Sequence, residues 1–369
     1  MTAPGGERAG APVWLLSPAL SLLLLLFVGS SLPAASAATG ERASPTRPHP
    51  LCSRVASTGG SDRSRGSRRA PYRTLDRLAE SLRPGMVGCL RAGTYGSPST
   101  SNDFRRSGTP QARITLRSYP GERATLQGYT AIDGSYVTFS YLKIDNTNTF
   151  GIGGECGGRY ESFTLAGSNI VLKHNEITAS DTSHSSNGIY IIGSNENISF
   201  NKIHDVGACQ RFDHGVYVAH SRSFKIEYNW IYNCRDGWGI QLFPDAAGGR
   251  IRHNIIDGCG SGITISGGDG ETSQHNLIDH NLITNSVGLQ SSNEGTAIAG
   301  CCASSPNGNL VIQNMFWRNA GGSFDNYVGR SYLARENVSA NPRYVNRAAR
   351  DFRVRAPRAK KLGLWNGGA

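Results

Sequence analysis

The sequence predicts an all-β solenoid, a parallel β-helix in which every rung contributes three short strands. Three observations favour this fold: an asparagine motif that repeats about once per rung, apolar residues at fixed offsets from each asparagine, and a second apolar pattern marked by glycine. The repeating asparagines, which are 26, 28, 25, 27 and 33 residues apart, are Asn175, Asn201, Asn229, Asn254, Asn281 and Asn314.

The apolar residues around each asparagine predict two of the three strands. Leu172 stands three residues before Asn175 and Ile177 two residues after it, and Ile, Val or Phe takes these places in the other repeats. The third strand follows from the segments NGIYI, HGVYV, WGIQL and SGITI, in which apolar residues alternate after a glycine. The glycines that mark them are Gly188, Gly215, Gly239 and Gly262.

Stacking is what makes such a repeat stable. One unit is too small to bury its apolar face alone, whereas stacked units pile Ile, Val and Leu into continuous columns. A leucine-rich horseshoe is the nearest alternative, but its leucine consensus is absent. An asparagine at the same turn of every rung satisfies backbone groups of the turn, so we expect Asn175 through Asn314 to form a hydrogen-bonded ladder that serves as scaffold.

The N-terminal part has the composition of an exported protein. Residues 1–37 contain a short leucine-rich run and the small-residue sequence Ala35-Ser36-Ala37, which predict a cleaved signal peptide rather than a membrane span. Residues 38–73 are rich in Ser, Arg, Gly and Pro and predict a basic, disordered leader. Residues 74–369 are expected to form the β-helix domain with a basic C-terminal segment, and no membrane span is expected after cleavage.

Charge and cysteines limit the partners and the compartment. The formal charge is +11, but it comes from eight arginines in residues 41–73 and from six arginines and two lysines in residues 343–361. The body between them is slightly acidic, which disfavours nucleic acid as a partner. All eight cysteines lie after residue 37, as expected for an oxidising, extracellular compartment. Cys52 with Cys89 and Cys234 with Cys259 are candidate pairs, and we expect a monomer.

Several segments carry a family resemblance. LRPGMVGCLRAGTY, ARITLRSYPGERATLQG and IDGSYVTFSYLKIDN resemble the entry turns of secreted bacterial polysaccharide lyases, and NPRYVNRAARDFRVRAPRAKKLG resembles their closing segment. The chain therefore resembles the pectate-lyase-like superfamily, which implies a right-handed single-stranded parallel β-helix, a solenoid of three-strand rungs. The superfamily includes lyases, hydrolases, epimerases and inert surface proteins, so function has to be argued from a site.

The candidate site lies on the third strand of each rung and on the turn before it. If Val216 and Val218 face the core, alternation places one outward column of side chains, formed by Tyr190, Tyr217, Gln241 and Thr264. Four residues before the marker glycines stand His184, Arg211 and Arg235. Nearby turns carry Asp205, Asp213 and Asp236, and His214 follows Asp213.

This composition suits the cleavage of an acidic polysaccharide by β-elimination. The reaction needs a group that neutralises the uronate carboxylate, a base for the C5 proton and a donor for the leaving oxygen. We expect Arg211 and Arg235 to hold carboxylates, and His214 or Tyr217 to move the proton. The residues expected to contact the polysaccharide are His184, Tyr190 and Gln241. The candidate Ca²⁺ ligands are Asp205, Asp213 and Asp236.

Other interpretations remain open at this point. By parity His214 faces inward or lies at a turn, which would make it a hydrogen-bonded rung residue. The main alternative to a lyase is a non-catalytic secreted protein that binds glycan or belongs to the cell surface. A glycoside hydrolase or a uronate epimerase is the third, and hydrolysis would need two carboxylates at a defined separation, such as Asp213 with Asp236.

Overall fold

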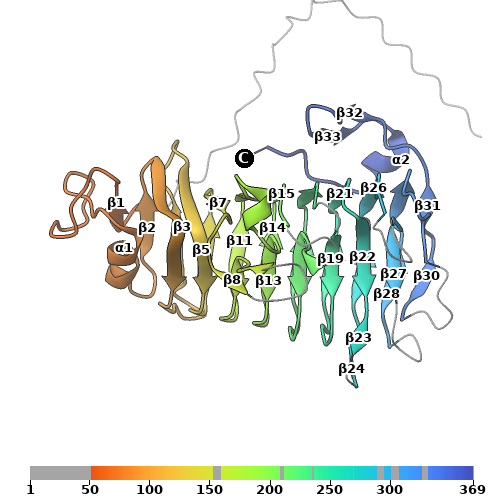
Figure 1. Ribbon diagram of the computed structural model, residues 1–369, viewed down its shortest axis with the longest axis horizontal. Helices are drawn as coiled ribbons and strands as arrows, with labels where there is room; N and C mark the ends of the chain where they lie inside the picture. Colours follow the sequence, from red (N-terminus) through yellow and green to blue (C-terminus); the bar gives the residue numbers. More distant parts are fainter. Residues whose placement is uncertain are drawn as a thin grey trace, which may run out of the picture. The chain divides into compact units, whose positions relative to one another are not determined.

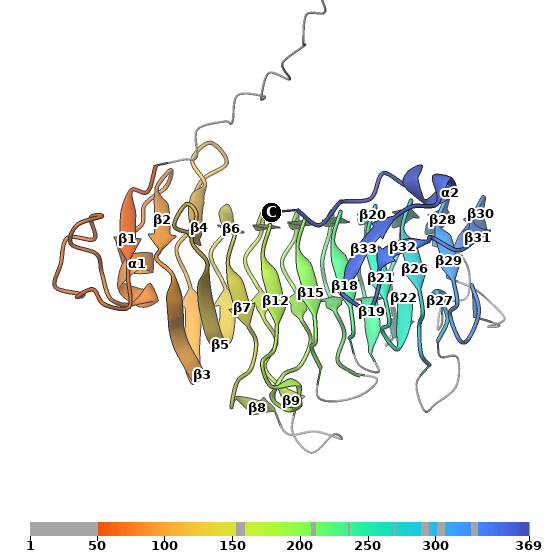
Figure 2. The ribbon, with the colours of Figure 1, turned by 90° about the horizontal axis from the view of Figure 1, so that it is seen from above.

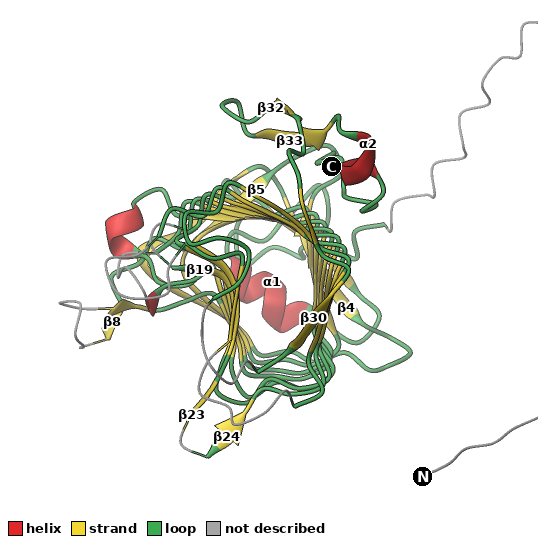
Figure 3. Cartoon of the chain, turned by 90° about the vertical axis from the view of Figure 1, so that its right-hand side faces the viewer, coloured by secondary structure: helices red, strands yellow, loops and turns green. Residues whose placement is uncertain are grey.

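The computed structural model confirms the predicted solenoid (Figures 1 and 2). It describes residues 51–152, 159–207, 212–234, 237–268, 270–288, 295–300, 307–325 and 331–368. Short strands pair in parallel with the strands of the rungs before and after them, and they form three columns. Viewed along its axis, the solenoid encloses a core between these columns (Figure 3).

Column A is the sheet that precedes the asparagine turn. Its central strands join Leu172, Ile198, Ile226, Ile251, Ile278 and Val311 in register, and all six side chains are fully buried. Each such burial stabilises the fold by roughly 1.5–3 kcal/mol. The strands are β1 (Arg54–Ala56), β2 (Val87–Leu90), β4 (Ile114–Ser118), β6 (Val137–Ser140), β11 (Val171–Lys173), β14 (Asn197–Ser199), β17 (Lys225–Glu227), β20 (Arg250–Arg252), β25 (Leu277–Asp279), β28 (Leu310–Ile312) and β30 (Leu333–Arg335).

Columns B and C follow the asparagine turn. Two long strands, β3 (Gly93–Phe104) and β5 (Ala124–Ile132), run through both columns at the N-terminal end. Column B continues with β7 (Lys143–Asp145), β12 (Glu176–Thr178), β15 (Lys202–His204), β18 (Trp230–Tyr232), β21 (Ile255–Asp257), β26 (Leu282–Thr284), β29 (Met315–Trp317) and β31 (Val338–Ser339). Column C continues with β10 (Thr164–Leu165), β13 (Ile189–Ile191), β16 (Val216–Val218), β19 (Trp238–Leu242), β22 (Ser261–Ile265) and β27 (Ile298–Gly300).

The asparagine ladder forms as predicted. The side-chain oxygen of Asn201 accepts hydrogen bonds from the backbone N–H (2.9 Å) and the side-chain amide (3.2 Å) of Asn175. The Asn201 amide in turn donates to Leu172 O at 2.9 Å and to the Asn229 side-chain oxygen at 3.1 Å. The residue before each asparagine has a positive φ, for example 58° at Phe200, which gives the turn its sharp corner.

The N-terminal boundary differs from the expectation. Residues 51–73 were expected to belong to a disordered leader, but they hold strand β1, which pairs with β2, and the buried Tyr72. The Cys52–Cys89 disulfide and the carboxylate of Asp62, which accepts from the backbone N–H of Arg73 and of Thr74, hold this segment in place. The basic composition of residues 51–73 indicated disorder, but a disulfide and hydrogen bonds stabilise this segment as part of the solenoid. Residues 1–50 lie outside the described part of the chain.

Helix α1 (Leu75–Ser81) covers the N-terminal end of the solenoid (Figure 3). Thr74 caps it by accepting a hydrogen bond from the backbone N–H of Arg77. Its apolar side, with Leu75, Leu78 and Ala79, is buried and belongs to the core of the solenoid. The helix thus shields apolar groups that the first rung would otherwise expose.

The C-terminal segment folds back along column B. It contains the antiparallel pair β32 (Tyr344–Asn346) and β33 (Asp351–Val354) and the short helix α2 (Pro357–Lys360). Its apolar side chains pack on the outer face of column B in a second cluster, formed by Trp230, Tyr232, Ile255, Leu282, Met315, Phe352, Ala356, Ala359 and Leu362. Some of its basic residues are therefore structural: Arg347 pairs with Asp257 and Arg350 with Asp205.

Both cysteine pairings proposed from the sequence are present. Cys52 bonds to Cys89 and Cys234 to Cys259, each linking neighbouring parts of the solenoid. The other cysteines lie outside the described residues. Among the described residues no helix has the length and apolar composition needed to cross a membrane.

Candidate functional site

The outer face of column C carries the predicted stack of side chains. Thr164, Tyr190, Tyr217, Gln241 and Thr264 are register partners on successive strands. The tyrosines are half-buried between fully buried neighbours, so they point away from the core, and their ring centroids lie 5.1 Å apart at 47°. Thr264 is buried instead. Strand alternation alone predicted this arrangement, because successive side chains of a strand point to opposite faces.

The same face extends towards the N-terminus further than the sequence analysis recognised. Asp103 on β3 pairs in register with Ala131 on β5, and Ala131 pairs with Thr164. Asp103 therefore shares the outward column of Tyr190 and Tyr217. Its carboxylate accepts hydrogen bonds from Ser101 Oγ (2.7 Å) and from the guanidinium of Arg105 (2.9 Å).

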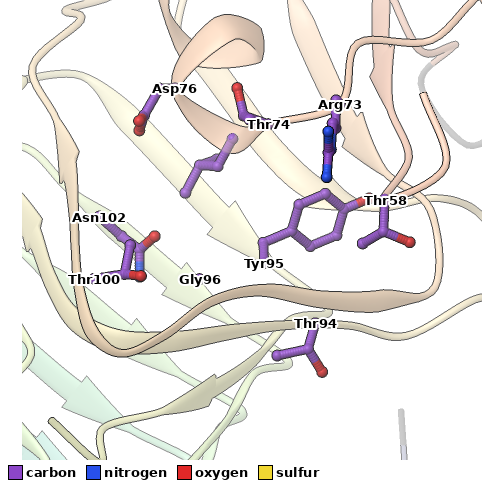
Figure 4. Close-up of a pocket in the computed structure, with 10 residues that line it drawn as sticks. Thr58, Arg73, Thr74, Asp76, Thr94, Tyr95, Gly96, Thr100 and Asn102 are labelled. Carbon is purple, nitrogen blue, oxygen red and sulfur yellow. The ribbon is translucent and has the colours of Figure 1, made fainter. Parts of the chain in front are cut away.

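Two cavities flank β3 at this end of column C. One, of about 320 Å³, is lined by Thr58, Arg73, Thr74, Leu75, Asp76, Thr94, Tyr95, Gly96, Thr100 and Asn102 (Figure 4). The other, of about 330 Å³, is lined by Asp76, Ala79, Glu80, Ser101, Asp103, Arg105 and Arg106. Asp76 belongs to both. Burial raises the pKa of Asp76, and the nearby carboxylates of Glu80 and Asp103 raise it further.

Sequence reasoning missed Asp76, Asp103 and Arg105. Asp76 and Asp103 are 27 residues apart and come from a helix and a strand, so no local motif unites them. A signal was nevertheless present, because the segment DFRRSG concentrates one acidic and two basic residues next to a predicted strand. This segment, however, contains none of the marker glycines of the repeat, so the sequence could not align it in register with Tyr190.

His214 is a buried rung residue, which was one of the two open interpretations. Its side chain is 2% exposed, and its Nδ1 accepts a hydrogen bond from the backbone N–H of Trp238 at 3.0 Å. Its own backbone N–H donates to the Asn187 side-chain oxygen at 2.7 Å. The imidazole lies edge-on against the Tyr217 ring, with centroids 5.6 Å apart. The role of His214 as the proton acceptor stays a prediction, and in the structure its ring packs against the ring of Tyr217.

The aspartates proposed as calcium ligands have other bonding. Asp213 is buried and accepts a hydrogen bond from Ser186 Oγ at 2.7 Å. Both oxygens of Asp205 contact the guanidinium of Arg350, at 2.6 and 3.1 Å. Asn233 and His204 also bond to the Asp205 carboxylate. Burial by itself would raise the pKa of Asp205, but the hydrogen bonds from His204, Asn233 and Arg350 outweigh it and hold the pKa well below its usual range.

The calcium hypothesis stays a prediction. In the structure Asp213 accepts a hydrogen bond and Asp205 forms an ion pair, whereas a Ca²⁺ site needs six to eight oxygen ligands. Asp205 moreover contacts the C-terminal segment rather than the outward column of Tyr217. Asp236, Arg211 and Arg235 lie outside the described residues, so their expected roles stay predictions.

The other residues predicted to contact the polysaccharide are Gln241, on the strand after that of Tyr217, and His184, in the turn before the strand of Tyr190. Gln241 is half-buried next to Tyr217. His184 ends a short 3-10 helix (Thr182–His184) in the turn that precedes β13, and its Nδ1 contacts the Asp181 carboxylate at 2.6 Å. The outer face of column C thus presents the tyrosine rings and the Gln241 amide, and a polar turn precedes strand β13.

Comparison with known proteins identifies the family to which this fold belongs. A sequence profile described as "Right handed beta helix region" matches residues 126–316, which is more than half of the chain. A protein of Bacillus subtilis (strain 168), the uncharacterized protein YwoF, is 26% identical over 159 residues, which cover 43% of this chain and only 30% of that protein.

Solved structures show the same architecture. The pectate lyase Pel9A has a TM-score of 0.59 at 14% identity, covering 84% of this chain and 87% of its own. A glycoside hydrolase has a TM-score of 0.55 at 9% identity, covering 84% and 99%. These identities are low enough that the likeness concerns the fold alone. With its stacked three-strand rungs and the matching profile, the chain belongs to the right-handed parallel β-helix family.

Proposed function

We propose that the protein is a secreted, carbohydrate-active β-helix protein that binds an acidic polysaccharide along the outer face of column C and cleaves it by β-elimination. The observation that carries the proposal is the outward column from Asp103 to Gln241, in which Tyr190 and Tyr217 precede Gln241. Its six register positions span about 24 Å at ~4.8 Å per strand, with the buried Ala131 and Thr164 between Asp103 and the tyrosines. A row of side chains of this length along the strand stack suits a polymer better than a small molecule.

Chemistry and fold both support a carbohydrate. Tyrosine presents an apolar ring that stacks on a sugar face and a hydroxyl that hydrogen-bonds, and Gln241 adds an amide with donors and acceptors. The names of the two solved structures with the same fold, a pectate lyase and a glycoside hydrolase, denote proteins that act on carbohydrates. The likeness supports the function through the fold alone, so the specific activity has to be argued from the side chains of the site.

In the proposed reaction the hydroxyl of Tyr217 donates the proton that the leaving oxygen takes. A base removes the C5 proton of the uronate, the electron pair forms the C4–C5 double bond, and the C4–oxygen bond breaks while that oxygen takes a proton. The hydroxyl of Tyr217 is on the outward side of the strand, and the imidazole of His214 fixes the ring edge-on. Neutralising the uronate carboxylate remains the expected role of Arg211 and Arg235.

Secretion is part of the same proposal. The signal-like sequence of residues 1–37 favours export, and the Cys52–Cys89 and Cys234–Cys259 disulfides suit an oxidising compartment. A polysaccharide substrate would be met outside the cell. N-terminal sequencing of the protein from culture medium tests this, with a mature chain that starts near residue 38 as the expected result.

The test of the activity is the ultraviolet absorbance of the unsaturated uronate product. The purified protein is offered pectate, alginate and glycosaminoglycans, each with and without Ca²⁺. With the active substrate, Tyr217→Phe is expected to lower kcat by about 10²- to 10⁴-fold, the range that positioned acid–base groups contribute. Tyr228→Phe, which alters a ring stacked between Phe200 and His253 away from column C, serves as the matched control.

Unchanged turnover in Tyr217→Phe would remove that residue from the mechanism. No product from any substrate, by a protein whose circular dichroism shows the β-fold, would refute the lyase. Retained polysaccharide binding in that case would support the non-catalytic, glycan-binding alternative.

Hydrolysis is the second candidate, because one observation favours it specifically. Asp76 and Asp103 line the same cavity at the end of the column, and the pKa of Asp76 is raised while Asp103 accepts hydrogen bonds from Arg105 and Ser101. A carboxyl group with a raised pKa beside a second carboxylate is typical of a general acid and its partner. Release of reducing ends without new ultraviolet absorbance, abolished by Asp103→Asn, would favour this reaction.

A further inference from the structure

Three potential metal ligands meet at the turns that follow column C. His220 follows β16, Asp245 follows β19, and Glu271 begins β24 (Glu271–Thr272), which pairs with β23 (Gly267–Gly268). The residues are 25 and 26 positions apart, which is one rung each, so the stacking brings them into one group. Their ligand atoms all lie within 4.8 Å of one another, and His220 Nδ1 is 3.7 Å from a carboxylate oxygen of Glu271.

Neighbouring groups hold the Asp245 carboxylate and the backbone of Glu271 in position. Arg222 donates to the backbone oxygen of Asp245 at 2.7 Å and also pairs with its carboxylate. Glu271 sits in a tight antiparallel pair: a Cβ added at Gly267 would lie 2.3 Å from the backbone oxygen of Glu271. Outer groups that orient ligands in this way are a regular part of metal sites.

The spacing fits a small divalent ion. Zinc binds nitrogen and oxygen at about 2.0–2.2 Å, so two ligands of a tetrahedral site are about 3.4 Å apart. The contact between His220 and Glu271 is already close to this value, and the third ligand has to approach by no more than about 1.4 Å. His220 and Glu271 are exposed, so their side chains can make such an adjustment by rotation about side-chain bonds, whereas Asp245 is half-buried.

The donor set selects the kind of metal. One imidazole nitrogen with two carboxylates suits zinc and related first-row transition metals, whereas Ca²⁺ takes six to eight ligands that are all oxygen. Two carboxylates and the guanidinium of Arg222 leave the group with a net charge of about −1 when His220 is neutral, which a divalent cation would complement.

We propose that His220, Asp245 and Glu271 form a site for a divalent transition-metal ion such as Zn²⁺. Three protein ligands leave at least one coordination position for water or for an anionic group. His220 comes three residues after Tyr217 in the sequence, and Asp245 four residues after Gln241. The site therefore lies beyond the C-terminal ends of β16 and β19, the strands that carry the proposed polysaccharide face. A carboxylate of the substrate is the anion that would occupy the open position, and this last role alone rests on the proposed function.

An ordinary surface ion pair is the competing interpretation. His220 and Glu271 are both exposed, and exposed ion pairs contribute little to stability. The two interpretations differ in a measurable way, because an ion pair binds no metal, whereas a metal site binds one equivalent with an affinity that depends on all three ligands.

The test is calorimetric titration of the full mature chain, prepared without a histidine tag and freed of metal with EDTA, using Zn²⁺ and Ca²⁺ separately. We expect one equivalent of Zn²⁺, weak or absent Ca²⁺ binding, and at least a tenfold loss of Zn²⁺ affinity in His220→Ala and in Glu271→Gln. His184→Ala is the control, because His184 is also an exposed histidine beside a carboxylate, that of Asp181.

The proposal fails if the wild-type protein binds no Zn²⁺, or if His220→Ala and Glu271→Gln both keep wild-type affinity. Equal loss in the His184→Ala control would also overturn it. Circular dichroism of each variant excludes misfolding as the cause, and Asp245→Asn gives a third, independent check. Metal binding is measured without substrate, so the outcome is separate from the fate of the lyase proposal.

Discussion

Glu196 is a carboxyl group buried in the solenoid, and its replacement by glutamine is expected to stabilise the protein in a pH-dependent way. Its side chain is 1% exposed, and Oε2 accepts a hydrogen bond from Ser221 Oγ at 3.2 Å. Oε1 has no partner from another residue in the described chain. Burial raises the pKa of Glu196 from 4.5 to about 7, against the smaller opposing effect of its hydrogen bonds.

The magnitude follows from this shift. One pKa unit corresponds to about 1.4 kcal/mol, so a pKa raised from 4.5 to about 7 amounts to about 3 kcal/mol. The folded state binds the proton more tightly than the unfolded state. The resulting stability is therefore fully present below about pH 4.5 and is lost as the pH rises through about 7.

Urea unfolding at several pH values is the assay, with far-ultraviolet circular dichroism as the signal. Relative to wild type, Glu196→Gln is expected to have an equal free energy of unfolding near pH 4 and one higher by roughly 2–3 kcal/mol near pH 9. Glu227→Gln is the control, because Glu227 is a half-exposed glutamate of β17. A Glu196→Gln effect that does not change with pH would refute the reasoning, since it would show that the carboxyl titrates alike in both states.

Three further predictions concern the scaffold. Asn229→Ala removes a side chain that accepts two hydrogen bonds and donates two to buried backbone and amide oxygens, so it is expected to lower the free energy of unfolding by roughly 3 kcal/mol in urea titrations. Cys52→Ser with Cys89→Ser opens a loop of 37 residues and should cost about 3–4 kcal/mol, seen as a lower Tm that dithiothreitol lowers by less than it lowers the wild-type Tm, because only the Cys234–Cys259 disulfide is left to reduce. Arg350→Ala leaves Asp205 without its guanidinium partner, so limited proteolysis should cleave the C-terminal segment faster than in wild type, and equal rates would contradict this.

The site illustrates where sequence reasoning stopped. Tyr190, Tyr217 and Gln241 were placed correctly because a strand alternates strictly and because each follows its marker glycine by two residues. His214 and Asp205 were harder, because their positions in turns fix neither burial nor partners. Asp205 is 145 residues from the Arg350 that neutralises it, a contact that no local pattern encodes.

The sequence by itself determined the solenoid, its period, its asparagine ladder and the outward column of tyrosines, since all of these follow from a local pattern repeated in every rung. Only the tertiary structure decided which polar groups meet across rungs and which termini cover which face. In the folded chain Asp76 and Asp103 line the same cavity, His220 contacts Glu271, and the C-terminal segment packs on column B. These contacts depend on the lengths and paths of irregular turns, which hydrophobic periodicity does not specify.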